Sequence, residues 1–197
     1  TANIAVTGGT PNYTYVWTPG GQKTASVNNL SAGSYTVTVK DLKGCTTTPI
    51  VTITQPALLA ITFLNTVNVS CNGGNNGSTT ANPTGGTAPY TYQWLPVNTT
   101  SATLSNASAG TYTDIVTDKN GCTASKVITL TEPVPLVVTS TITNVSCANG
   151  NNGSIKIVAS GGKSGYTYLW LPINKTTATV TGLTAGSYSL TVTDANE

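Results

Sequence analysis

The sequence contains no histidine, arginine or methionine, and charged residues make up only 7% of its 197 residues. Lysine supplies all eight basic residues against six acidic ones, which leaves a net charge of +2. Without arginine the chain lacks the planar guanidinium that grips phosphates and guanine through two hydrogen bonds, and no basic stripe replaces it. We therefore expect no binding to nucleic acid.

Long hydrophobic runs and helical periodicity are also missing. The longest apolar stretch, ALLAITFL at 57–64, is far shorter than the ~20 residues that a membrane-spanning helix needs. No window shows the hydrophobic period of about 3.6 residues that marks an amphipathic helix. The sequence therefore predicts neither membrane insertion nor helices.

Few side chains are suited to catalysis. With no histidine, acid–base chemistry would depend on six carboxylates, on lysine or on thiolates. Asp114 and Asp118 fall on one face of a predicted strand, but four residues of strand separate them by about 13 Å, too far to share a proton. We expect no catalytic site, no metal, no cofactor and no enzymatic activity.

What the sequence does contain is a tandem repeat. Trp17, Trp94 and Trp170 lie 77 and 76 residues apart, and the same offsets relate three glycine pairs, three tyrosines and three aspartates. We divide the chain into a partial first repeat at 1–56, a complete middle repeat at 57–133 and a partial third repeat at 134–197. The pattern predicts a segment of a longer array.

Each repeat has the pattern of a small β-sandwich. The chain has 20 glycines and 10 prolines, and turn-rich words such as NGGNNG (72–77) and DKNG (118–121) separate short alternating segments. In the middle repeat we expect strands at 59–70, 78–83, 90–95, 101–105, 111–118 and 124–131. Six or seven short strands in a unit of this length predict an all-β, immunoglobulin-like sandwich.

An aromatic cluster recurs as NYTYVWTP, PYTYQWLP and GYTYLWLP. Strand alternation sends its two tyrosines and its tryptophan to one face, where they would close the core; an outward row would instead form a platform for sugars. A further tyrosine in each word AG(S/T)Y resembles a tyrosine corner, whose hydroxyl bonds back to the preceding loop. The structural residues predicted on this basis are Tyr90, Tyr92, Trp94 and Tyr112, with Trp17, Tyr35, Trp170 and Tyr188 in the other repeats.

Three aspartates, Asp41, Asp118 and Asp194, each close a strand before a turn. A single carboxylate at each site fits turn capping better than calcium ligation, the alternative, because calcium takes six to eight oxygens.

Asp114 departs from the repeat pattern. It stands where the other repeats have Val37 and Leu190, on the inward face of a predicted strand. An ionised carboxylate without a partner would lower the stability of the fold there by on the order of several kcal/mol; otherwise the carboxyl stays protonated. We expect either a bulge that turns Asp114 outward or a hydrogen-bonded partner.

Four cysteines, Cys45, Cys71, Cys122 and Cys147, are disulfide candidates, and their pairing would indicate an oxidising, extracellular setting. A bridge from Cys71 to Cys122 would close a loop of about 50 residues within one repeat. In an immunoglobulin-like topology, however, the turns that carry them lie at opposite poles, which favours bridges to cysteines of the adjoining repeats, outside this sequence.

The joints between repeats, ITQPALLAIT (53–62) and ITLTEPVPLVV (128–138), contain prolines and no glycine or serine spacer. Such joints predict a semi-rigid rod rather than beads on a flexible string. Low charge and exposed sandwich edges leave two arrangements open, a homo-oligomeric bundle of parallel chains and a stalk made of a single chain.

Four motifs occur together in the middle repeat: VSCNGGNNGS (69–78), TGGTAPYTYQW (84–94), AGTY (109–112) and DKNGC (118–122). Their combination resembles the SprB-type repeat of Bacteroidota surface proteins, and the resemblance covers essentially the whole chain. It implies very large adhesins on the bacterial cell surface, including gliding-motility adhesins exported by the type IX secretion system. It also implies an extracellular location and no enzymatic activity.

One turn departs from that family, which often has aspartate where this chain has Asn75-Asn76 and Asn151-Asn152. The departure weakens the expectation of calcium there. Three functions compete: a structural stalk or filament segment that gives reach and bears load, an adhesive module that itself binds glycan or another cell's surface, and, with the least support, an enzyme or signalling domain. Buried aromatic clusters favour the stalk, whereas an exposed aromatic row favours the adhesive module.

Overall fold

The computed structural model describes residues 1–196, which form 17 β-strands and no helix. The chain divides into two compact units, Thr1–Ala57 and Leu58–Glu197. The first unit holds the first repeat, and the second unit holds the middle and third repeats. The predicted all-β, tandem immunoglobulin-like architecture is confirmed.

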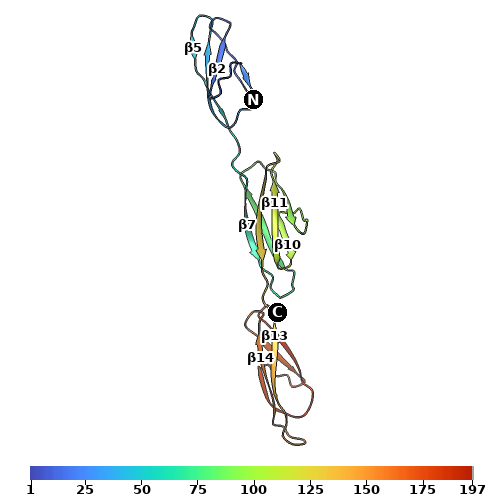
Figure 1. The fold of residues 1–197 in the computed structure, drawn as a ribbon. Helices are drawn as coiled ribbons and strands as arrows, with labels where there is room; N and C mark the ends of the chain where they lie inside the picture. The colour runs from blue at the N-terminus through green and yellow to red at the C-terminus, as the bar shows by residue number, and fades with distance from the viewer. Residues whose placement is uncertain (197) are drawn as a thin grey trace. The chain divides into compact units, whose positions relative to one another are not determined.

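The middle repeat is a sandwich of two antiparallel three-stranded sheets (Figure 1). One sheet has the order β10-β8-β7 and the other the order β12-β11-β9. Each strand lies close to a segment expected from the sequence. The strands are β7 (Ala60–Val67), β8 (Gly77–Thr84), β9 (Thr91–Leu95), β10 (Thr103–Ala107), β11 (Gly110–Thr117) and β12 (Thr123–Leu130).

The first repeat has six strands, two-residue strands among them, and the described part of the third repeat has five. In the first, β1 pairs with β3, and β4 pairs with β2, β5 and β6. Its strands are β1 (Ala2–Asn3), β2 (Thr14–Thr18), β3 (Ser26–Val27), β4 (Gly33–Lys40), β5 (Thr46–Thr47) and β6 (Ile50–Ile53). In the third, a sheet β13-β14-β16 faces the pair β15-β17. Its strands are β13 (Val137–Thr143), β14 (Gly153–Ser160), β15 (Thr167–Leu171), β16 (Thr179–Leu183) and β17 (Ser189–Thr193).

The core of the middle repeat lies between its two sheets. Trp94 on β9 is fully buried, and Phe63 on β7 approaches it from the other sheet with ring centroids 5.6 Å apart. Leu104, Tyr112, Val116 and Leu130 are among the other buried members of the cluster. The alternating burial along β11 reflects the period of two residues that sends every second side chain inward.

Asp114 contradicts both outcomes expected for it. β11 pairs with β12 through eight consecutive residues and with β9 through five, without a register shift, so Asp114 lies in regular strand geometry rather than in a bulge. It is 0% exposed, and neither carboxylate oxygen has a hydrogen-bond partner within residues 1–196. Both neighbouring strands hold β11 in place, which leaves no room for the extra residue of a bulge.

The residue opposite Asp114 on β12 is Lys126, but its ammonium is engaged elsewhere. Lys126 Nζ donates to the carbonyl oxygen of Ile61 at 3.0 Å and lies 5.6 Å from the centroid of the Phe63 ring. Burial raises the pKa of the Asp114 carboxyl to about 6, and the nearby backbone amide of Ile115, which makes no hydrogen bond to the carboxylate, lowers it to a smaller extent. Asp114 therefore lowers the stability of the middle repeat at neutral pH.

We expect Asp114→Val, which restores the residue type of Val37, to raise the free energy of unfolding at pH 7 by roughly 3 kcal/mol, since the pKa shift is about two units. Because the folded-state pKa is raised, this cost is absent below about pH 4 and appears as pH rises through about 6. Urea unfolding of both proteins across this range measures the difference. Thr113→Val on the same strand is the control and keeps the wild-type pH slope. Equal stability of Asp114→Val and wild type at pH 7 contradicts the account.

Candidate functional site

The three tryptophans occupy the centres of their repeats. Trp94 and Trp17 are 0% exposed and Trp170 is 2% exposed. Each indole N–H donates to a backbone carbonyl seven residues later, at 3.0 Å in the bond from Trp94 to Ser101. With both ring faces and the polar edge occupied, these tryptophans are not available to a ligand.

The tyrosines of the aromatic cluster are half-buried and face their own loops. Tyr90 donates its hydroxyl to the carbonyl oxygen of Gly85 at 2.6 Å, and the same bond recurs from Tyr13 to Gly8 and from Tyr166 to Gly161. Tyr92 lies two residues closer to Trp94 along the chain and packs against the core. Burial, with smaller effects from Asp114 and Tyr90, raises its pKa. The cluster therefore lines the inside of the sandwich rather than an outer platform.

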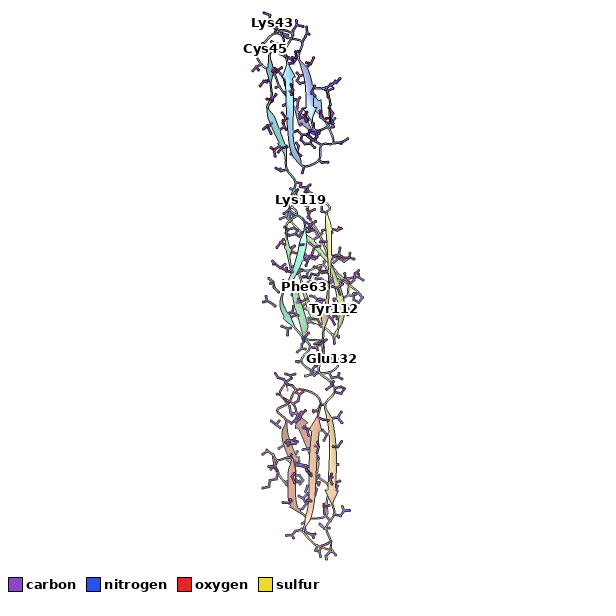
Figure 2. The ribbon with its side chains drawn as sticks, turned by 60° about the vertical axis from the view of Figure 1, so that its left-hand side comes forward. Lys43, Cys45, Phe63, Tyr112, Lys119 and Glu132 are labelled. Carbon is purple, nitrogen blue, oxygen red and sulfur yellow. The ribbon has the colours of Figure 1, made fainter. Side chains whose placement is uncertain are left out.

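The second set of tyrosines forms the corner expected from the word AG(S/T)Y. Tyr112 donates to the carbonyl oxygen of Ser108 at 2.9 Å, Tyr35 to Ser31 at 3.0 Å and Tyr188 to Thr184 at 3.0 Å. Each bond ties the beginning of a strand, or in the third repeat the residue before it, to the preceding loop. Figure 2 shows Tyr112 within the middle sandwich.

The aspartates at the strand ends cap turns. Asp118 accepts hydrogen bonds from the backbone amides of Thr87 at 2.8 Å, Asn120 at 2.8 Å and Cys122 at 2.9 Å. Burial acts to raise the pKa of Asp118, but these amides together hold it below its usual value. Asp41 makes corresponding bonds to Thr10 and Cys45. Within residues 1–196 no three His, Cys, Asp or Glu side chains gather where they would hold a metal ion.

The side-chain amide of one asparagine closes the asparagine-rich turn, because it both donates and accepts a hydrogen bond. Asn76 Oδ1 accepts from the Ser70 amide at 2.9 Å, while its Nδ2 donates to Ser70 Oγ at 2.6 Å. Asn152 makes the same pair of bonds to Ser146, at 3.0 and 2.8 Å. Aspartate could not supply the donor, so asparagine here has a structural reason. This role was not predicted, although the identical spacing from serine to asparagine in both repeats is a signal for it.

The cysteines lie in turns at the ends of the sandwiches. Val69 N donates to Thr131 O at 2.9 Å, which places Cys71 near the end of β12, whereas Cys122 comes just before that strand begins. An eight-residue strand spans about 26 Å, far beyond the ~7 Å between Cα atoms that a disulfide allows. Accordingly, no disulfide forms within residues 1–196. Bridges from Cys45, Cys71, Cys122 and Cys147 to adjoining repeats stay a prediction.

Glu132 is a functional candidate that the sequence reasoning missed. Its carboxylate accepts from Asn72 Nδ2 at 2.9 Å and from the Gly73 amide at 2.8 Å, and Asn72 Nδ2 also lies 3.1 Å from Pro133 O. Figure 2 shows Glu132 at one end of the middle sandwich and Lys119 at the other. These contacts join residues about 60 positions apart, so the only sequence signal was a carboxylate in an otherwise uncharged joint.

We expect Tyr112→Phe to lower the free energy of unfolding of the middle repeat by about 1 kcal/mol, because the Ser108 carbonyl loses its partner at a partly buried site. Thermal or urea unfolding followed by tryptophan fluorescence measures the loss. Tyr92→Phe is a matched control, since the Tyr92 hydroxyl makes no hydrogen bond to residues 1–196, and it changes stability by less. An effect of Tyr92→Phe as large as that of Tyr112→Phe argues against the corner.

Solved structures similar to this chain are arrays of immunoglobulin domains. The first eight immunoglobulin domains of Down syndrome cell adhesion molecule are 18% identical with a TM-score of 0.35, covering 80% of this chain and 24% of that chain. Domains 1–5 of Sidekick-1 are 14% identical with a TM-score of 0.36, covering 93% and 53%. The chain thus spans less than two thirds of the length of either structure. No curated protein matches it.

The SprB repeat family matches three segments, at residues 1–22, 64–99 and 139–174. Each segment contains the tryptophan on which its sandwich is centred, and the segments recur with the spacing of the repeats. Each of the three sandwiches therefore contains a segment that matches the SprB repeat.

Proposed function

We propose that this chain is a structural stalk or filament segment of a large repetitive adhesin at the bacterial cell surface. It gives reach and bears load during attachment or gliding, and it carries out no reaction. The repeat family supports a cell-surface, adhesin-like region, and export through type IX secretion by a member of the Bacteroidota belongs to the same proposal. The joint between the middle and third repeats supplies the observation that carries the stalk role.

The joint is bonded along its length. On the side of the middle repeat, Glu132 and Pro133 hold the turn at Asn72 and Gly73. On the side of the third repeat, the Gly162 amide donates to the carbonyl oxygen of Val134 at 2.8 Å. Consecutive residues of the joint are therefore tied to one sandwich and then to the next, which leaves no free spacer between them.

A second contact bridges the two repeats away from the joint itself. Asn196, in the turn after β17 of the third repeat, donates its side-chain amide to the carbonyl oxygen of Ser70 in the middle repeat. The turn after β7 of the middle repeat thus meets the turn after β17 of the third repeat. Two attachments between neighbouring repeats resist bending better than one, as a load-bearing segment requires.

The alternative, an adhesive module that binds glycan, has less support. It calls for an exposed aromatic row, but Trp94 and its counterparts are buried, and the hydroxyls of Tyr90 and Tyr112 are bound to backbone carbonyls. The aromatic repetition is accounted for by the core of each sandwich.

We expect Glu132→Ala to loosen the joint without unfolding the sandwiches. The Gly73 amide would lose a charge-assisted acceptor, so its hydrogen exchange should accelerate by about tenfold or more. Residual dipolar couplings would then report weaker coupling between the orientations of the middle and third repeats. Gln55→Ala, the corresponding position in the preceding joint, is the matched control and leaves Gly73 protected. Unchanged exchange at Gly73 in Glu132→Ala would sink the proposal that this clasp holds the joint.

A further inference from the structure

The carboxylate of Glu132 binds both nitrogens of one Asn-Gly step. Its Oε1 accepts from the side-chain amide of Asn72 at 2.9 Å, and its Oε2 accepts from the backbone amide of Gly73 at 2.8 Å. Because the two nitrogens converge on one carboxylate, the side chain of Asn72 is folded towards the peptide nitrogen that follows it. All three residues are exposed to solvent at the end of the middle sandwich, where Figure 2 shows Glu132.

These two nitrogens are the reacting atoms of asparagine deamidation. In that reaction the peptide nitrogen of the next residue attacks Cγ of the asparagine, the side-chain nitrogen leaves as ammonia, and a cyclic imide forms. The attacking nitrogen must lose a proton and the leaving nitrogen must gain one. A single side chain that takes the first proton and delivers it to the leaving nitrogen therefore assists both steps.

Glu132 is placed for both proton transfers. A general base has to lie about 2.6–3.2 Å from the atom whose proton it takes, and the distances from Glu132 to Gly73 N and to Asn72 Nδ2 fall in this range. Gly73 has a φ of 72°, and within residues 1–196 no heavy atom outside its chain neighbours lies within 4 Å of where its Cβ would stand. The approach of its nitrogen to Asn72 is therefore not crowded.

The third repeat contains the same dipeptide held in a different way. Asn149-Gly150 lies in the corresponding turn, and Gly150 N donates to the carbonyl oxygen of Cys147 at 3.0 Å. A backbone carbonyl accepts a hydrogen bond but does not take up the proton at neutral pH. The two Asn-Gly steps thus share their chemistry and differ in the group that holds the attacking nitrogen.

We propose that Asn72-Gly73 is a site of self-catalysed deamidation, in which Glu132 acts first as general base and then as general acid. Glu132 takes the Gly73 amide proton as Gly73 N bonds to Asn72 Cγ. It returns a proton to Nδ2 as the Cγ–Nδ2 bond breaks and ammonia leaves. Water then opens the imide at either carbonyl, which leaves aspartate or isoaspartate in place of the asparagine. The reaction modifies the chain once and turns over no substrate.

The product weakens the clasp at the joint. Asn72 Nδ2 is the donor to both Glu132 and the carbonyl oxygen of Pro133, and a carboxylate in its place donates to neither. Two negative charges then lie side by side, which disfavours the closed turn. Deamidation therefore loosens the joint as the protein ages. The inference concerns the chemistry of the clasp and holds whether or not the segment is a stalk.

Peptide mapping by mass spectrometry measures the rate at each asparagine in the full chain, kept at neutral pH and sampled over time. We expect Asn72 to deamidate faster than Asn149 in the same molecules, by about tenfold or more. In urea, where both turns are unfolded, the two Asn-Gly steps should react at similar rates, because only the fold distinguishes them. This comparison needs no variant.

Glu132→Gln keeps the size of the side chain and an acceptor oxygen but takes up no proton at neutral pH. It should slow the reaction at Asn72 by about tenfold or more and leave the rate at Asn149 unchanged. If the hydrogen bonds to Glu132 instead protect Asn72, the folded chain reacts more slowly there than at Asn149 and Glu132→Gln reacts faster. That result would overturn the proposal, and so would equal rates at Asn72 in the wild type and in Glu132→Gln.

Discussion

Each repeat is organised around one buried tryptophan. A sandwich of under 80 residues buries little apolar surface, so a single large side chain that reaches both sheets decides whether the core is filled. Trp94 fills it from β9, contacts Phe63 of the facing sheet and uses its N–H on the Ser101 carbonyl. The strand that carries it must keep its register against β11, and the whole repeat is built on that pairing.

Because the core is small, the ends of the sandwich are fixed by turn side chains rather than by packing. Asp118 gathers three backbone amides at one end of the middle repeat. Asn76 and Glu132 order the turn at the other end, where the chain passes to the third repeat. The bond that joins this end to the third repeat runs from the side-chain amide of Asn196 to the carbonyl oxygen of Ser70, in the same turn region. A repeat built in this way concentrates its specific polar contacts at the joints, where a stalk needs them.

Much of this architecture follows from the sequence. The positions of the strands and the roles of Trp94 and Tyr112 are local properties, because alternation and turn words extend over a few residues. Asp114 was misjudged since the alignment showed the inward position but not that pairing on both sides would hold the carboxylate there without a partner. Glu132 was missed because its partners lie about 60 residues away in sequence. Association of parallel chains involves a second chain, and the bridges between repeats involve cysteines outside this sequence. Both therefore stay predictions.

The central claim is that the joint between the middle and third repeats is a bonded, load-bearing connection. Single-molecule force spectroscopy on the full chain, pulled from its two ends, tests this most directly. We predict that extension proceeds by abrupt unfolding of whole sandwiches, with no separate lengthening at low force from the joint at 131–136. A gradual low-force extension that Glu132→Ala leaves unchanged would show that this joint is a flexible linker and would contradict the stalk.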